Sequence, residues 1–275
     1  MPPHWVTVLL GGVSVLGCAV LYLQWRDWRS VEGPRTGSPL PDVGPERFSP
    51  LCVLVAFAHF ILPLVFVALW AGLGFELSSH LVFVVSIFIN GIILCLVLGL
   101  WPPLRGFIVG ARSCGLVWHP LACLWGTFAL AGMAGVIVNA GLWLLKAVSG
   151  RDFSIVPQDM LGEIAQNRED IFSLALVCTS VVIAAPLAEE VFFRGVLYPR
   201  FKRGLGVWRA SSLTGLLFGL VHFNVGAFLP LAFMGAYFCL VYEKTGSLYA
   251  PIVAHGLFNL QSFLVVVLFP KMVNM

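Results

Sequence analysis

The sequence predicts an all-α membrane protein with about eight transmembrane helices. Its 275 residues are 59% hydrophobic and 11% charged, whereas soluble domains carry roughly 25% charged residues. The mean hydropathy is +0.95, and the apolar residues gather in runs of about 20, the length that crosses a bilayer as a helix. These observations exclude a soluble domain. The net charge of +3 forms no basic patch suited to nucleic acid.

Eight apolar runs are the candidate transmembrane helices: 5–24, 51–74, 79–101, 121–145, 171–190, 210–226, 228–242 and 248–269. The first run has no Lys or Arg before it and stays apolar beyond Cys18, so we expect a retained anchor and not a cleaved signal peptide. The sixth and seventh runs are short, and the sequence FNVG where they meet favours a tight turn.

Two polar segments interrupt the apolar runs. Residues 30–50 are rich in Pro, Gly and charge and predict a flexible loop. Residues 151–170 are acidic, and PQDMLGEIAQ within them favours a short surface helix that begins near Pro157. Neither segment contains a catalytic pattern.

Positive charge predicts the topology, because Lys and Arg are enriched in cytoplasmic loops. With the N-terminus outside, the inside loops hold eleven basic residues: Arg26, Arg29, Arg35, Arg47, Arg105, Arg112, Arg200, Lys202, Arg203, Arg209 and Lys244. The outside segments then hold four: Lys146, Arg151, Arg168 and Lys271. We therefore expect both termini outside.

Ionisable residues inside the spans are the candidate functional groups. Glu189 and Glu190 lie in the apolar sequence VVIAAPLAEEVFFRGVLYPR, and His222 and His255 lie in the last third of the chain. At about 1.5 Å of helical rise per residue, Glu189, His222 and His255 all lie roughly 16–20 Å from the nearest inside basic residue. In a hydrocarbon core about 30 Å thick, this depth is close to the midplane. Three helices therefore bring ionisable groups to one level.

The spacing of the polar residues predicts which of them share a helix face. Residues four apart project together, so Glu190 pairs with Arg194, Phe218 with His222, and His255 with Asn259. Gly215 and Gly219 allow another backbone to approach. A buried polar network that locks helix packing would also place polar groups in this way, but intramembrane ionisable residues more often mark a functional site.

At these residues the chain resembles the CPBP family of intramembrane proteases, which includes type II CAAX prenyl endopeptidases and bacteriocin-processing or immunity proteins. The family pattern is E-E-x-x-x-R, F-x-x-x-H and H-x-x-x-N on successive helices. Here it is EEVFFR at 189–194, FGLVH at 218–222 and HGLFN at 255–259. The resemblance implies a division into an N-terminal transmembrane region of about four helices, 1–170, and a catalytic transmembrane core, 171–275.

The resemblance implies an intramembrane endopeptidase with a conical catalytic cavity and no cofactor. Its catalytic set would be Glu189, Glu190, His222, His255 and Asn259, with Arg194 and Phe218 in support. Glu189 would activate water with the help of His222. His255 and Asn259 would stabilise the oxyanion, and Glu190 with Arg194 would support the site. The substrate would be a membrane-associated or lipidated protein or peptide, and the enzyme would lie in the cytoplasmic membrane if its source is bacterial.

Three alternatives use the same residues differently. Two glutamates and two histidines are a possible zinc set, although no H-E-x-x-H sequence is present and none of the seven cysteines stands in a C-x-x-C pair. A proton-coupled transporter would also hold membrane carboxylates and histidines, but repeated halves are not evident. A non-catalytic membrane partner or immunity protein would retain the motifs as packing.

Overall fold

The computed structural model describes residues 4–30, 58, 61–62, 65–74, 79–100, 116–151 and 170–268. Within these ranges every regular element is a helix and no strand is formed, which confirms the predicted all-α class. Its elements are α1 (His4–Ser30), α3 (Ser79–Leu100), η2 (Leu116–Trp118), α5 (Pro120–Ser149), α7 (Ile171–Cys178), η3 (Thr179–Ala184), α8 (Ala185–Glu190), η4 (Val191–Leu197), α9 (Tyr198–Leu220), α10 (Val225–Thr245) and α11 (Tyr249–Leu268).

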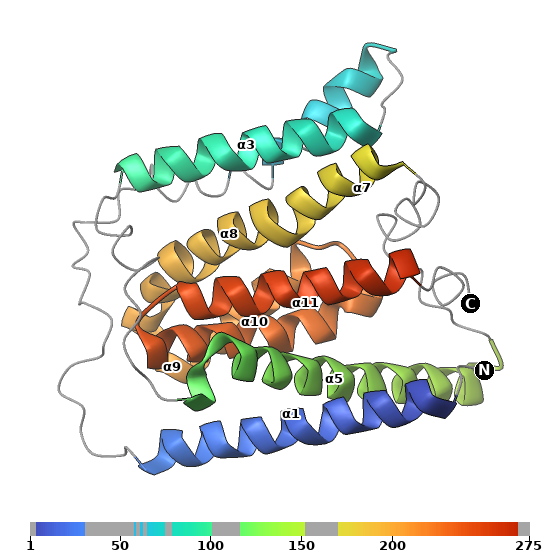
Figure 1. The fold of residues 1–275 in the computed structure, drawn as a ribbon, viewed down its shortest axis with the longest axis vertical. Coiled ribbons are helices and arrows are strands. Elements are labelled where there is room, and N and C mark those ends of the chain that lie inside the picture. Colours follow the sequence, from blue (N-terminus) through green and yellow to red (C-terminus); the bar gives the residue numbers. More distant parts are fainter. Residues whose placement is uncertain are drawn as a thin grey trace.

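The long helices run roughly along one direction and form successive layers (Figure 1). Helix α3 lies on α7 and α8, which lie on α11, and α5 packs against both α10 and α11. Helix α1 closes the other side of the bundle by packing on α5. The elements from α7 to α11 therefore lie between α3 and the α1–α5 pair.

Four described helices are long and apolar enough to cross a bilayer, so the chain is a membrane protein: Pro120–Ser149, Ile171–Leu220, Val225–Thr245 and Tyr249–Leu268. Leu81–Leu96 is a shorter apolar helix. The described residues do not confirm the count of about eight. Residues 51–57, 59–60 and 63–64 of the predicted run 51–74 lie outside them, as do residues 31–50 of the predicted loop and the surface helix expected after Pro157.

The predicted boundary at residue 190 is wrong. The helix continues beyond Glu190 through η4 into α9, and neither Gly195 nor Pro199 ends it. The chain turns instead at Gly206, whose φ of 73° and ψ of 175° are outside the helical region. The tight turn predicted at FNVG, residues 223–226, is found slightly earlier, at 221–224. There Phe223 has a φ of 49°, and Asn224 caps α10 by accepting a hydrogen bond from the Ala227 amide.

Glycines bring α9 and α10 into direct backbone contact, as predicted for Gly215 and Gly219. A Cβ atom on Gly215 would lie 2.4 Å from the Ala232 carbonyl oxygen, and one on Gly219 would lie 2.6 Å from that of Phe228. Any larger residue would therefore push the two helices apart. The intramembrane polar residues lie against this close pair of helices.

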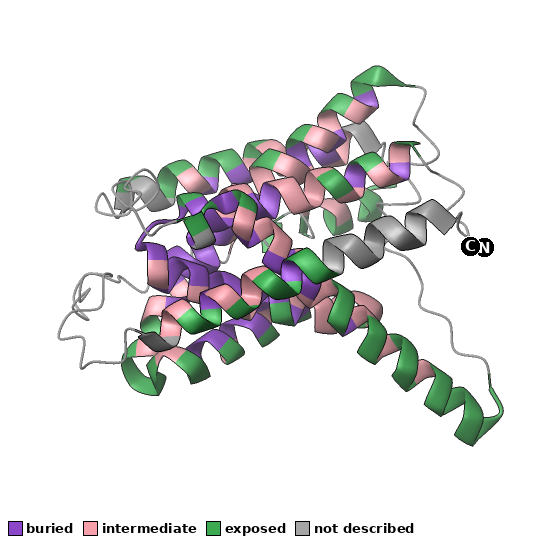
Figure 2. Cartoon of the chain, turned by 60° about the horizontal axis from the view of Figure 1, so that its bottom comes forward, coloured by how far each residue is buried: buried purple, intermediate pink, exposed green. Residues whose placement is uncertain are grey.

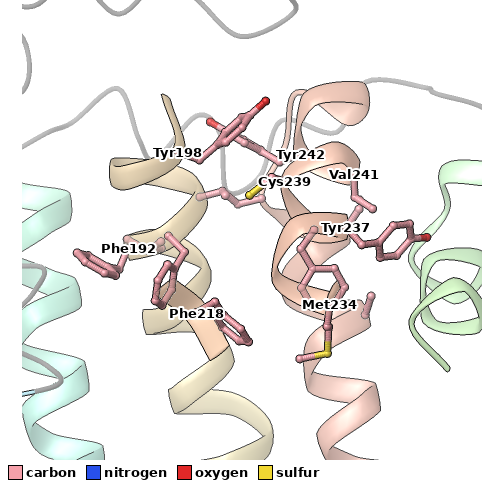
Figure 3. Close-up of a cluster of buried hydrophobic side chains, with 14 of the residues drawn as sticks. Phe192, Tyr198, Phe218, Met234, Tyr237, Cys239, Val241 and Tyr242 are labelled. Atoms are coloured by element: carbon pink, nitrogen blue, oxygen red, sulfur yellow. The ribbon is translucent and has the colours of Figure 1, made fainter. Parts of the chain in front are cut away.

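The best-buried part of the molecule lies around α9 and α10, whereas the far half of α5 projects from the bundle with exposed side chains (Figure 2). Figure 3 shows buried side chains of this core, among them Phe218, with Tyr237 directed towards α5. Many of the exposed side chains of α5 are large and apolar. An apolar outer surface of this kind is expected for helices that face lipid.

Polar contacts join α1 to this core. The Tyr237 hydroxyl donates a hydrogen bond of 2.9 Å to Gln24 Oε1. The Asp27 carboxylate accepts from Trp118 Nε1 at 2.9 Å and pairs with Lys244 Nζ at 3.0 Å. The N-terminal region therefore fixes α10 from the side opposite to the glutamates, and the division into regions 1–170 and 171–275 stays a prediction.

Candidate active site

Glu189 and Glu190 form the end of α8, a short α-helical stretch between two π-helical segments, η3 and η4. A π turn contains an additional residue, so it changes the direction in which the following side chains point, and such turns occur often at functional sites. Pro186 lies in the first turn of α8 and is buried. The two glutamates thus occupy a helix whose register is altered on both sides.

Glu190 is fully enclosed, and one of its two oxygens, Oε1, holds all its hydrogen bonds from the described residues. Its Oε1 atom lies 2.9 Å from Arg194 Nη1, and neither side chain is exposed to solvent. The predicted pairing of these residues across one helical turn is confirmed. A buried charge is tolerated when a partner of opposite charge lies within hydrogen-bond distance, so this ion pair is a structural centre of the site.

The Arg194 guanidinium has further partners from three helices. Its Nη2 atom donates a hydrogen bond of 2.8 Å to the Gly235 carbonyl on α10. The Cζ atom lies 4.8 Å from the ring centroid of Phe218, 5.4 Å from that of Phe238 and 5.7 Å from that of Phe193. Aromatic faces attract a guanidinium, especially away from water. Phe218 therefore supports the site, as predicted, by enclosing this cation.

His255, on α11, lies between the two carboxylates. Its Nδ1 atom is 2.9 Å from Glu190 Oε1, and its Nε2 atom is 4.0 Å from Glu189 Oε2. Because a carboxylate paired with arginine accepts hydrogen bonds, Nδ1 is the protonated nitrogen that donates to Glu190. The ring packs between Phe218 and Phe238, both at 5.7 Å between centroids, so its orientation is fixed.

Glu189 differs from its neighbour in having little compensation. Its side chain is 13% exposed, whereas that of Glu190 is 0% exposed. The Oε2 atom is buried and forms no hydrogen bond with any residue in the described part of the chain, which also holds for Glu190 Oε2, but Glu189 lacks the two hydrogen bonds that Glu190 has at Oε1. A buried polar atom without a partner is rare in a native protein and calls for a functional explanation.

His222 enters the site from the end of α9. Its Nδ1 atom lies 2.7 Å from the Phe218 carbonyl oxygen, which can accept but not donate, so Nδ1 carries the hydrogen and Nε2 has a free lone pair in the neutral ring. The ring packs on Phe218 at 4.9 Å between centroids. In the described ranges, no hydrogen bond or ion pair joins His222 to Glu189. Phe218 therefore separates the two histidines.

Asn259 follows His255 by one helical turn, but its amide group forms a different contact. Its Nδ2 atom donates a hydrogen bond of 2.9 Å to the Val181 carbonyl in η3. The predicted arrangement of His255 and Asn259 on one face of α11 is found, with the histidine directed at the glutamates and the asparagine at the backbone that precedes them. The seven predicted site residues thus lie on α8, η4, α9, the turn that follows α9, and α11.

The zinc alternative needs three protein ligands around one point. Across the described ranges, no group of three or more His, Cys, Asp or Glu residues is arranged to hold a metal ion. In addition, His255 Nδ1 is already bonded to Glu190. The described residues therefore form no three-ligand zinc set, and the expectation that the site needs no cofactor stays a prediction.

Sequence reasoning missed four contributors to the site: Phe193, Phe238, the Gly235 carbonyl and the π-helical segments. Phe193 and Phe238 are two of 22 phenylalanines, and nothing in their spacing distinguishes them. A carbonyl group and a backbone register have no signature in residue types. One signal was available, because Pro186 within an apolar helix indicates an irregular hydrogen-bond pattern.

Comparisons with known proteins match the same region. Residues 171–261 match the family model described as type II CAAX prenyl endopeptidase Rce1-like. The chain is 25% identical over 137 residues to YdiL of Bacillus subtilis (strain 168), named a membrane peptidase, over 44% of this chain and 55% of that protein. It is 31% identical over 101 residues to CAAX prenyl protease 2 of Homo sapiens, over 30% of this chain and 31% of that protein.

The chain thus spans about half the length of the bacterial relative and about a third of the human one. No solved structure matches it significantly. The matched region contains the glutamate pair, Arg194, both site histidines and Asn259. The comparisons therefore confirm the predicted family resemblance, with residues 171–261 as the part that matches the Rce1-like type II CAAX prenyl endopeptidases.

Proposed function

We propose that this protein is an intramembrane endopeptidase in which Glu189 activates the water that hydrolyses a peptide bond. The observation that carries the proposal is the contrast between the two carboxylates. Glu190 Oε1 is held by Arg194 and His255 at 2.9 Å each, whereas Glu189 has no hydrogen bond from the described residues and only His255 Nε2 at 4.0 Å from its Oε2. A general base needs a free oxygen that can reach the proton it removes.

The reaction follows from this geometry. Glu189 accepts a proton from water while the water oxygen attacks the carbonyl carbon of the scissile peptide bond. The electron pair of the carbonyl moves to its oxygen and forms an oxyanion. When the carbonyl re-forms, the C–N bond breaks, and Glu189 returns its proton to the leaving nitrogen. One carboxylate thus acts first as base and then as acid.

The two histidines have separate roles in this reaction. The free Nε2 of His222 accepts a hydrogen bond from the attacking water and helps to orient it. A protonated His255 donates through both ring nitrogens, through Nδ1 to Glu190 and through Nε2 towards the oxyanion that forms beside Glu189. Fixed donors of this kind stabilise developing charge strongly where water is scarce.

The substrate is a membrane-associated or lipidated protein or peptide. Support for this class comes from the position of the glutamates within an apolar helix of the bundle and from the family model, whose description names prenyl endopeptidases. The proposed enzyme crosses the membrane about eight times with both termini outside, and in a bacterium it lies in the cytoplasmic membrane.

Glu189→Gln tests the proposal, because the amide keeps the volume but removes the charge and the basic oxygen. The purified chain in lipid vesicles is incubated with a library of membrane-anchored reporter peptides, and cleavage and thermal unfolding are measured together. We expect cleavage to disappear, with the unfolding midpoint retained. Cleavage by the wild-type chain is expected to survive a strong chelator, since the proposed reaction uses no metal.

Glu243→Gln is the matched control. Glu243 is also largely buried, but its carboxylate binds Tyr198 and Lys202 at the end of α10. This variant is expected to cleave the reporter as the wild type does. Near-normal cleavage by Glu189→Gln, or loss of cleavage in the chelator, would refute the mechanism.

A further inference from the structure

A break in the backbone hydrogen bonds lies directly before the glutamates. In η3 the Ala185 amide donates to the Ser180 carbonyl, five residues earlier, as in a π-helix. The next bond in this register would join the amide of residue 186 to the Val181 carbonyl. Residue 186 is Pro186, which has no N–H group. The Val181 carbonyl therefore has no backbone donor in this register.

A side chain from another helix provides the missing hydrogen bond. Asn259, on α11, donates from Nδ2 to the Val181 oxygen at 2.9 Å. In a bilayer no water replaces a lost backbone bond, so neighbouring helices must satisfy the groups that a proline frees. The Asn259 side-chain amide thus donates the hydrogen bond to Val181 that the backbone of Pro186 cannot donate.

Gly256 gives α11 the close approach that this bond requires. A Cβ atom on Gly256 would lie 2.8 Å from the Val182 carbonyl oxygen, the next carbonyl along η3. Gly256 and Asn259 are three residues apart and so share a face of α11. The preceding residue, His255, contacts Glu190. A single turn of α11 thus contacts both the π-helical segment and the carboxylate that follows it.

We infer that Asn259 is a positioning residue, which replaces the hydrogen bond that Pro186 cannot form and thereby holds the π-helical register of η3. The register matters because a shift of one residue in a helix rotates the following side chains by about 100°. Such a rotation would turn Glu189 and Glu190 away from His255. In this role the Asn259 amide acts on the protein backbone, whereas the family resemblance assigns it to the oxyanion.

A double-mutant cycle separates the two roles. Pro186→Ala restores an amide N–H at residue 186, so the Asn259 side chain is no longer needed to satisfy the π turn. Wild type, Asn259→Ala, Pro186→Ala and the double variant are compared as full-length chains in lipid vesicles. The readouts are the unfolding midpoint and the kcat and KM for a reporter peptide that the wild type cleaves.

We expect Asn259→Ala alone to lower the unfolding midpoint and to reduce kcat by about 10²-fold with little change in KM, because a small displacement of a reacting group is enough for such a loss. In the Pro186→Ala background, the same substitution is expected to change both quantities far less. Asn139→Ala is the control, since the Asn139 amide bonds the Gly135 carbonyl within its own helix and is exposed. It should alter neither readout.

An equal loss of kcat in both backgrounds would overturn the inference, because an oxyanion donor is needed whatever residue 186 is. If Pro186→Ala is itself inactive, the unfolding midpoints decide: a midpoint restored in the double variant supports the inference, and purely additive losses overturn it. The activity readout rests on the proposed function, but the midpoints do not. A chain that cleaves no reporter would therefore refute the peptidase proposal while the cycle still tests Asn259.

Discussion

Replacement of Arg194 by methionine is expected to destabilise the whole bundle. The guanidinium bonds Glu190 and the Gly235 carbonyl and lies among three phenylalanine rings, and neither it nor Glu190 is exposed to solvent. Methionine fills similar space but leaves the carboxylate without a cation. Removal of one partner of a buried ion pair costs about 3–5 kcal/mol.

This loss is large compared with the total free energy of unfolding, which is about 5–15 kcal/mol for a typical domain. At about 1.4 kcal/mol per tenfold change, the ratio of folded to unfolded protein should fall by roughly two to three and a half orders of magnitude. Arg194→Lys should be milder, because a charge remains near Glu190. It should still lose activity in part, since an ammonium group cannot donate to Glu190 and Gly235 in the planar geometry of arginine.

The assay is denaturant unfolding of the purified chains in mild detergent, followed by circular dichroism. The double variant Glu190→Gln/Arg194→Met provides the internal comparison, because it removes the charge on both sides. It should unfold at a higher denaturant concentration than Arg194→Met, although it lacks one more native group. A single variant as stable as wild type, or a double variant no more stable than the single one, would show that the ion pair is not the centre of the site.

Two further predictions concern the frame of the site. Gly215→Ala should lower the unfolding midpoint by several degrees, since its Cβ would lie 2.4 Å from the Ala232 oxygen. Gly204→Ala is the control, because a Cβ there meets no atom within 4 Å, and it should leave thermal unfolding unchanged. Equal midpoints for the two variants would contradict the close helix contact. Single cysteines in the segments 30–50 and 151–170 should be labelled from opposite sides of the membrane; labelling of both from one side would overturn the proposed topology.

Sequence spacing predicted contacts within a helix better than contacts between helices. The pairing of Glu190 with Arg194 follows from a four-residue separation, and the close approach at Gly215 follows from the absence of a side chain. The partner of Asn259 could not be predicted in this way. Its spacing from His255 fixes a helix face, but the acceptor is a carbonyl that becomes free only where Pro186 meets a π turn.

The helix that carries the glutamates also shows why hydropathy misplaced a boundary. Residues 171–197 are apolar almost throughout, so composition identifies a buried or lipid-facing helix but contains no periodic signal that would reveal its register. The π-helical segments η3 and η4 are set by tertiary contacts, among them the Val181 carbonyl with α11 and Arg194 with α10. Sequence therefore located the glutamates, and only the assembled bundle determines which way each of them points.

The placement of Arg194 gives the two adjacent glutamates different chemistry. Both carboxylates lie in the same apolar helix, so burial alone would treat them alike. A four-residue spacing brings the arginine to Glu190 and not to Glu189, and three aromatic rings hold it there. Glu190 then serves as the fixed acceptor that orients His255 through Nδ1. The histidine in turn directs Nε2 towards Glu189, which has no hydrogen bond from the described residues and no arginine beside it. A single ion pair thereby makes one glutamate a structural group and its neighbour the candidate base.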